Sequence, residues 1–314
     1  MLCIAPGLVK QYSLARARHA AIMPAFLPPY NSFPIRRLWG LVARRSAQAA
    51  PCRSGPETMH SDSKLPGNGD PVVQVRGLSK EFGRFVAVDD LSFESRRGEI
   101  FGLLGPNGAG KTTTLRMLGT TLTPTRGTAV VAGHDVAAAP AQVRRSIGVL
   151  TAAIGLYGRL TARENVAYFG RLHGLGDAEI HRRVEGIFER LEMQAYADRP
   201  AEAFSTGMKQ KVAIARAIIH EPPVVILDEP TSGLDVLACQ LVREFMREMR
   251  GQGRCVILST HLMWDAELLC DRVAIVHGGR LIALDTVAGL KERTGTQNLE
   301  DAFMRLVRED GAPK

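Results

Sequence analysis

The sequence predicts an α/β fold with a parallel central sheet, an N-terminal antiparallel β layer and an inserted helical subdomain. Short, nearly continuous apolar runs alternate with helical stretches, which is the pattern of parallel strands that are buried on both faces. Apolar runs broken by glycines come before them, as in an antiparallel layer. A long section with helical periodicity and little β signal separates the second of the buried runs from the third.

The strands are expected in the following order. The antiparallel layer begins at residue 71, with β-like runs at 72–75 and 87–93 that are broken by Gly77, Gly83 and Gly98. The parallel strands are expected at 100–104, 147–150, 224–227, 256–258 and 273–276. No repeat of 20 to 50 residues is visible, which excludes solenoid folds.

Two signals indicate the helical subdomain, at about 152–220. Thr161 and Glu164 have the spacing of a capping box in front of an apolar run. Asp177 precedes apolar residues that fall on one helix face, namely Ile180, Val184, Ile187, Phe188 and Leu191. We therefore expect one α/β domain at 71–285 that contains this subdomain, followed by a C-terminal helical tail at 286–314.

The net charge of +8 lies at the N-terminus. Residues 1–56 contain eight Lys and Arg and no acidic residue, so the rest of the chain balances 32 basic against 32 acidic residues. Residues 1–70 are predicted to be a disordered basic leader, and three interpretations stay open: a targeting segment, an unstructured arm, or a stretch upstream of a true start at Met59. The neutral body weakens the case for nucleic-acid binding.

Membrane spans, disulfides and zinc sites are not expected. No apolar run approaches the roughly 18 residues that a spanning helix needs, so a membrane role is expected to come through a partner. The five cysteines are an odd number and contain no C-x-x-C pair, which argues against a disulfide framework or a structural zinc site. This cysteine usage favours a reducing compartment, the cytosol.

A phosphate-binding loop follows the strand expected at 100–104. Residues 105–112 fit the pattern G-x-x-x-x-G-K-[ST]. Its glycines let successive N–H groups curve around an anion, Lys111 reaches the β- and γ-phosphates, and Thr112 ligates Mg²⁺. The predicted ATP-binding residues here are Gly105, Pro106, Asn107, Gly108, Ala109, Gly110, Lys111, Thr112 and Thr113.

Two carboxylates end the apolar run at 224–227. Asp228 is expected at the carboxyl end of a parallel strand, where open α/β sheets bind ligands, so it can reach a Mg²⁺ ion. Glu229 can accept a proton from an attacking water.

With these motifs in order, the sequence resembles the ATP-binding subunit of an ABC transporter, over roughly 72–276 and more loosely to 306. Residues 204–208 (Phe-Ser-Thr-Gly-Met) resemble the signature motif of that family, and residues 232–235 (Ser-Gly-Leu-Asp) resemble its D-loop. His261 resembles the switch histidine, and Phe82 matches the aromatic residue that stacks on adenine.

The resemblance implies an ATPase in which two chains enclose two ATP molecules. Ser205, Gly207 and Asp235 would complete the nucleotide site of the opposite subunit, and Ser205 at a helix N-terminus also suits an anion. The implied catalytic residues are Glu229, His261 and Lys111, and the implied Mg²⁺ ligands are Thr112 and Asp228. His261 would hold the γ-phosphate and orient the water.

One position departs from the family, which usually carries a glutamine where this chain has Ala152. Residues 150–151, 155–165, 204–216 and 299–303 resemble the ATPase subunits of sodium-extruding exporters, which also lack that glutamine. The resemblance therefore implies a motor on the cytoplasmic face of the membrane that drives a separate permease, with sodium as the candidate substrate. The alternative is a soluble ABC ATPase that acts on ribosomes or nucleic acid, and the single P-loop argues against it.

Overall fold

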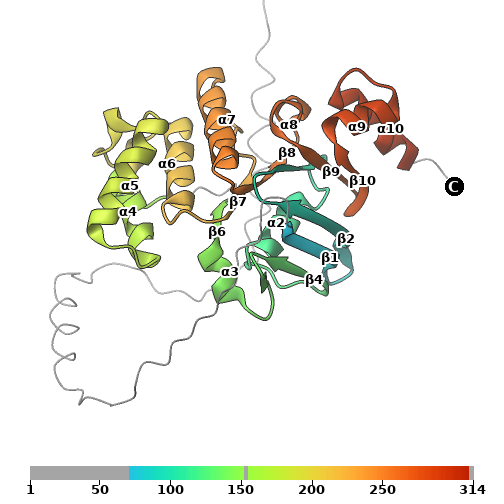
Figure 1. Cartoon of the computed structure of the whole chain (residues 1–314), viewed down its shortest axis with the longest axis horizontal. Helices are drawn as coiled ribbons and strands as arrows, with labels where there is room; N and C mark the ends of the chain where they lie inside the picture. The colour runs from blue at the N-terminus through green and yellow to red at the C-terminus, as the bar shows by residue number, and fades with distance from the viewer. Residues whose placement is uncertain (1–70, 152–154, 311–314) are drawn as a thin grey trace, which may run out of the picture. The chain divides into compact units, whose positions relative to one another are not determined.

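A computed structural model describes residues 71–151 and 155–310 of the chain (Figure 1). The predictions for the leader at 1–70, for a start at Met59 and for Ala152 therefore concern residues outside the described part. Within that part, an antiparallel sheet and a larger, mostly parallel sheet carry the fold. The predicted α/β fold class, with its antiparallel layer, is confirmed.

The antiparallel sheet has the strand order β2-β1-β4-β5. Phe82 and Phe85 pair across the turn that joins β1 to β2, and Gly83 in that turn has a φ of +60°. The predicted runs account for β1 and β2 but not for β4 and β5. The four strands are β1 (Pro71–Phe82), β2 (Phe85–Arg96), β4 (Arg126–Val131) and β5 (His134–Asp135).

The larger sheet has the strand order β10-β9-β3-β8-β7-β6. The five strands from β9 to β6 pair in parallel, as predicted, whereas β10 pairs antiparallel with β9 and was not predicted. The strands are β3 (Ile100–Leu104), β6 (Ile147–Leu150), β7 (Val224–Asp228), β8 (Cys255–Thr260), β9 (Arg272–His277) and β10 (Arg280–Thr286).

Each central strand contributes to two hydrophobic cores. Phe101 and Leu103 of β3 pack into the core that also holds α2 and the antiparallel sheet, whereas Ile100 and Leu104 pack into the core formed with the helices on the opposite face. Every residue of β3, β7 and β8 is buried. This burial on both faces explains why the strands are continuous apolar runs. Helices α2 (Lys111–Leu118) and α3 (Pro140–Ser146) belong to the first core.

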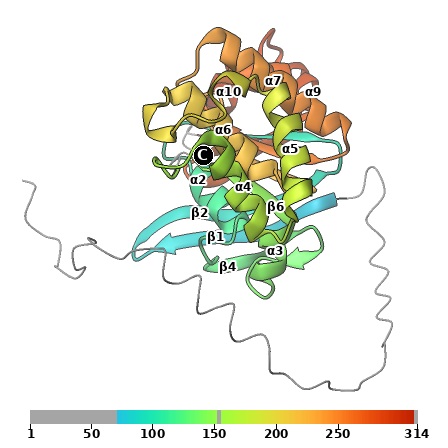
Figure 2. The ribbon, with the colours of Figure 1, turned by 90° about the vertical axis from the view of Figure 1, so that its left-hand side faces the viewer.

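The helical subdomain lies beside the β6 edge of the sheet (Figures 1 and 2). The capping box forms as predicted: the Glu164 backbone N–H donates to Thr161 Oγ1 at 3.1 Å, and the Thr161 N–H donates to Glu164 Oε2 at 2.9 Å. The predicted apolar face of α5 is buried. The helices are α4 (Ala162–Leu172), α5 (Asp177–Arg190) and α6 (Thr206–Ile218), with 3₁₀ turns at Gln194–Tyr196 and Ala201–Ala203.

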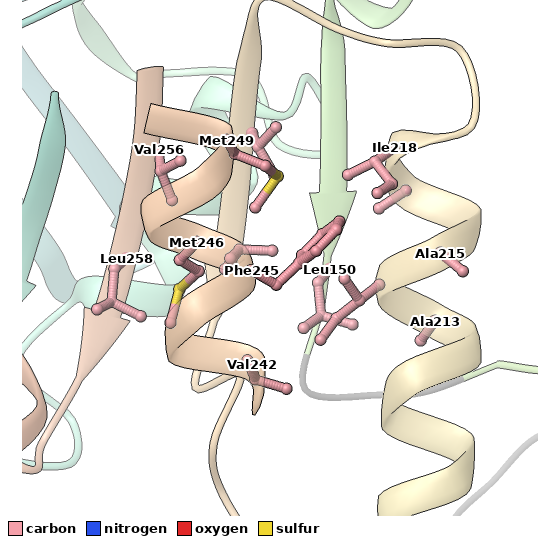
Figure 3. Close-up of a cluster of buried hydrophobic side chains, with 14 of the residues drawn as sticks. Leu150, Ala213, Ala215, Ile218, Val242, Phe245, Met246, Met249, Val256 and Leu258 are labelled. Atoms are coloured by element: carbon pink, nitrogen blue, oxygen red, sulfur yellow. The ribbon is translucent and has the colours of Figure 1, made fainter. Parts of the chain in front are cut away.

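Helix α7 packs on the sheet next to the subdomain. Figure 3 shows Phe245 and Met249 of α7 directed toward the side of α6, where Ile218 lies. Beyond the β10 edge, α9 contacts β10 and α10 contacts α8 and α9 (Figure 1). The remaining helices are α7 (Val236–Gly251), α8 (Met263–Leu269), α9 (Val287–Thr294) and α10 (Leu299–Asp310).

The boundary predicted at residue 285 falls one residue before the end of β10 and stays a prediction. In the described ranges, no helix has the length and the apolar character that crossing a membrane requires.

Candidate functional site

Three loops meet at one edge of the parallel sheet. They follow β3, β8 and β7, which are adjacent strands, and they begin at Gly105, His261 and Glu229. Because parallel strands present their carboxyl ends at the same edge, the sheet brings together three motifs that lie far apart in the sequence.

The loop between β3 and α2 depends on glycine. Gly108 and Gly110 have φ angles of +83° and +101°, and a Cβ atom on Gly110 would lie 2.5 Å from the carbonyl oxygen of Ala87. Gly110 is also the N-cap of α2 and offers no side chain to the first N–H groups of the helix. These donors remain available to an anion, as expected for a phosphate-binding loop.

Lys111 is buried against the same loop. Its Nζ donates to the carbonyl oxygens of Gly105, at 2.6 Å, and Pro106, at 3.0 Å. Burial lowers the pKa of Lys111, while Glu229 and Asp228 act in the opposite direction. The loop thus holds a cation next to two carboxylates.

Asp228 lies between two hydroxyl groups. Thr112 Oγ1 donates to its Oδ2 at 2.9 Å, and Ser259 Oγ donates to its Oδ1. Asp228 is 4% exposed, and it pairs with Ser259 in the parallel register of β7 and β8. A threonine hydroxyl beside a carboxylate is a set of hard oxygen donors that fits Mg²⁺. Ser259 was not among the predicted site residues.

Glu229 and His261 are in contact. His261 Nδ1 lies 2.8 Å from Glu229 Oε1, and the backbone N–H of Glu229 donates to the Ser259 carbonyl at 3.1 Å. Glu229 has a φ of +50°, a conformation that is uncommon for a residue other than glycine and that is often found at functional sites. The pair can exchange a proton with a group bound beside it.

A cavity of about 210 Å³ joins the P-loop to Glu229. Residues 107–113 line it together with Glu229, Ala87 and Phe85. Phe82, the predicted stacking residue, is absent from this lining; it is 48% exposed, and the Lys80 ammonium lies 5.3 Å from the centroid of its ring. Phe85 was missed because nothing in its sequence context separates it from the other residues of the hairpin.

Three predicted nucleotide-binding residues lie away from the cavity and close to one another. Ser205 caps α6 by accepting a hydrogen bond from the Met208 N–H at 3.3 Å, and Asp235 caps α7 in the same way. A Cβ atom on Gly207 would lie 3.5 Å from the side chain of Leu234, next to Asp235. In the described part of the chain, none of the three residues lines the cavity.

Buried polar contacts hold the loop that follows Glu229. Gln210 Nε2 of α6 donates to the Pro230 carbonyl at 2.9 Å. Thr231 Oγ1 donates to Asp265 Oδ2 at 2.6 Å, and Arg243 Nε of α7 donates to Asp265 Oδ1 at 3.0 Å. Asp265 is 2% exposed and belongs to α8, which begins just after His261. It therefore connects three segments around the site, and the sequence alone did not reveal it.

Removing Asp265 should destabilise the protein strongly. Asp265→Ala leaves the Arg243 guanidinium and the Thr231 hydroxyl without their partner in a buried setting, so we expect the free energy of unfolding to fall by about 3 kcal/mol. Urea unfolding followed by circular dichroism measures the loss.

The control is Glu309→Ala, which breaks an ion pair whose two side chains are both 59% exposed and should cost about 0.5 kcal/mol or less. Equal losses in the two variants would contradict the role given to Asp265.

Comparison with known proteins agrees with the resemblance seen in the sequence motifs. The profile of the ABC transporter family matches residues 88–232. The ABC transporter ATP-binding protein NatA of Bacillus subtilis is 44% identical over 224 residues, which cover 71% of this chain and 91% of the relative. The Nod factor export ATP-binding protein I of Ralstonia nicotianae is 42% identical, with 69% and 68% covered. The doxorubicin resistance ATP-binding protein DrrA of Mycobacterium tuberculosis is 38% identical, with 77% and 72% covered.

Solved structures show the same fold. The structure of an ATP-binding subunit of an ABC transporter superposes with a TM-score of 0.71 at 33% identity, covering 75% of this chain and 99% of the other. A dimeric ATP-binding cassette bound to ADP and Pi superposes with a TM-score of 0.64 at 24% identity, covering 68% and 98%. The motifs, the fold and these relatives agree: the chain belongs to the family of ABC transporter ATP-binding subunits and is an ATPase.

Proposed function

We propose that this chain is the motor subunit of an exporter and that the cavity between the P-loop and Glu229 binds Mg-ATP. One observation carries the proposal: a single cavity is lined both by residues 107–113 and by Glu229, whose carboxylate contacts His261. An anion in this cavity would be within reach of the P-loop N–H groups and would lie beside a group that can accept a proton.

Each residue then has a distinct task. The N–H groups of the P-loop and the Lys111 ammonium bind the β- and γ-phosphates, and Thr112 and Asp228 hold the metal. When bound, Mg²⁺ neutralises the charge of the phosphate oxygens. Glu229 accepts a proton from the attacking water, and His261, held 2.8 Å from its carboxylate, orients that water and the γ-phosphate.

Glu229→Gln should separate binding from hydrolysis. The amide keeps the shape of the side chain but cannot accept the proton, so turnover should fall by roughly 10²- to 10⁴-fold while the affinity for ATP stays near that of the unchanged protein. Lys111→Ala should instead weaken ATP binding. A steady-state ATPase assay and equilibrium binding of a fluorescent ATP analogue measure the two effects, and turnover close to normal in Glu229→Gln would refute the role of Glu229.

We also propose that Ser205, Gly207 and Asp235 act on the nucleotide of a second copy of this chain. Their absence from the lining of the cavity of their own chain supports this, as does the position of Ser205 at the N-terminus of α6, where the helix dipole favours an anion. Under this proposal, Glu229→Gln accumulates an ATP-dependent dimer in size-exclusion chromatography.

The adenine ring should stack on Phe82, the residue that the family resemblance indicates. Phe82→Ala should then weaken ATP binding by about 1–2 kcal/mol, a roughly tenfold rise in Kd, and should leave inorganic phosphate binding unchanged. Phe85→Ala is the matched variant, since Phe85 lies across the same turn and lines the cavity. A larger loss in Phe85→Ala than in Phe82→Ala would transfer the stacking role to Phe85.

The coupled transport is proposed to be sodium efflux through a separate permease, with this chain bound peripherally at the cytoplasmic face of the membrane. The resemblance of residues 150–151, 155–165, 204–216 and 299–303 to sodium-extruding exporters supports this substrate, whereas relatives at 38–42% identity are named for Nod factor export and doxorubicin resistance. In sequence, Ala152 takes the place of the glutamine that the family usually has, so Mg²⁺ would rely on Thr112 and Asp228.

The test of the sodium proposal begins by identifying the permease through co-purification with this chain. The chain and the permease are then expressed together, and sodium efflux and ATPase rate are measured side by side. We expect ATP-dependent efflux that Glu229→Gln abolishes. Absence of sodium efflux, with another substrate stimulating the ATPase, would refute the sodium proposal and leave the motor proposal standing. Ala152→Gln should disturb the stimulation of ATPase activity by the permease.

A further inference from the structure

A second, smaller cavity lies at the opposite end of the parallel strands from the P-loop. It has a volume of about 80 Å³ and lies between α5, α7 and the start of β8. Arg254 precedes β8, and His261 follows the far end of that strand. Six strand residues span about 20 Å at roughly 3.3 Å per residue, so this cavity is remote from the proposed ATP site.

Four arginines and one carboxylate line this cavity: Arg182, Arg183, Arg190, Arg254 and Glu221. Three of the arginines have carboxylate partners. Arg182 pairs with Glu179 at 2.6 Å, Arg183 pairs with Glu179 and Glu221, and Arg190 pairs with Glu248 at 3.2 Å. The cluster therefore contains one positive charge more than it has carboxylates to balance.

Arg254 carries this excess charge. In the part of the chain that the structure describes, no carboxylate lies within ion-pair distance of its guanidinium, although the residue is half-buried. Burial lowers the pKa of Arg254, and Arg190 and Arg183 add to this effect, whereas the carboxylates of Glu221 and Glu248 oppose it. An arginine stays protonated under such conditions, so a partly desolvated cation faces two other cations across the cavity.

His220 reports the same positive field. It follows α6, and its pKa is lowered to about 4, first by burial and then by His173, with Arg183 and Arg254 contributing as nearby positive charges. Its Nε2 lies 3.0 Å from the Ile147 carbonyl oxygen, while its buried Nδ1 has no hydrogen-bond partner. Arg183 and Arg254 thus act on His220 electrostatically, more weakly than burial and His173 do.

We propose that this cavity binds a single phosphate-type oxyanion, held by Arg254 together with Arg183 and Arg190. Planar guanidinium groups bind tetrahedral oxyanions through paired hydrogen bonds, and an oxyanion would supply the negative charge that Arg254 lacks. A volume of about 80 Å³ admits one such group and is far below the 300 Å³ or more of ordinary small-molecule pockets. This excludes a whole nucleotide as the occupant.

Binding would connect two parts of the fold. Arg183 and Arg190 belong to α5 of the helical subdomain, whereas Arg254 belongs to the turn between α7 and β8. Phe245 and Met249 of α7 and Ile218 of α6 supply the apolar part of the lining, and Figure 3 shows these three side chains between the two helices. The oxyanion would therefore bridge the subdomain and the sheet layer independently of ATP.

Inorganic phosphate tests this proposal in a background in which the P-loop is weakened as a phosphate site. In the full-length Lys111→Ala protein, without nucleotide, phosphate titrated at constant ionic strength should raise the Tm by about 3 °C at ten times its Kd. Adding Arg254→Gln should abolish most of that rise. Adding Arg145→Gln, which removes an exposed arginine of α3 outside the cavity, should leave it intact.

A second variant keeps the test informative if Arg254→Gln fails to fold. Arg190→Gln, at a half-exposed position, should also reduce the phosphate-dependent rise while the far-ultraviolet circular dichroism stays unchanged. The same rise in the Lys111→Ala protein with and without Arg254→Gln, or no rise in Lys111→Ala itself, would overturn the proposal.

The source of the phosphate group is distinguished with vesicles that contain phosphatidic acid. Co-sedimentation that Arg254→Gln abolishes assigns the group to a lipid headgroup, whereas a phosphate-dependent rise in Tm without co-sedimentation assigns it to a free oxyanion. A negative result in either assay does not bear on the proposal that the P-loop cavity binds ATP, because the assays contain no nucleotide and do not measure ATP binding.

Discussion

The parallel register of β3, β8 and β7 is the constraint on which the candidate site depends. Leu104 pairs with Thr260, and Asp228 pairs with Ser259, so the P-loop, the two carboxylates and His261 leave the sheet at the same level. A shift of one residue in β7 would turn Asp228 to the opposite face of the sheet, away from the hydroxyl of Thr112. The site chemistry is therefore set by strand pairing.

Burial of the sheet on both faces stabilises that register. Alternate residues of β3, β7 and β8 pack into two different hydrophobic cores. A shift of one residue in the register of a strand would move each of its apolar side chains from one core to the other. Helix α2 packs in the core between the two sheets, so the N-terminus of the helix is held against the P-loop by contacts far from any ligand. The phosphate-binding loop is thereby preorganised by apolar packing.

The charged side chains at the two ends of the parallel strands differ in how they are paired. At the carboxyl ends, Lys111, Asp228 and Glu229 are close together, and each is held by hydrogen bonds from the chain itself. At the amino ends, the four arginines of the second cavity, Arg254 included, outnumber by one the three carboxylates that pair with them. The first arrangement suits a ligand that carries its own cation, and the second suits a bare anion.

The sequence by itself determined the features that depend on local physics. The parallel strands are among them, because burial on both faces requires apolar runs. The P-loop is another, because its backbone geometry needs glycine at Gly108 and Gly110, and the capping box at Thr161 is a third.

Only the tertiary structure decided which distant groups meet. Phe85 beside the P-loop, Ser259 on Asp228, and Arg243 with Thr231 on Asp265 are contacts that arise from strand order and helix packing. Strands β4, β5 and β10 were missed for the same reason: they are short or partly exposed, so their pairing partners rather than their own residue patterns define them.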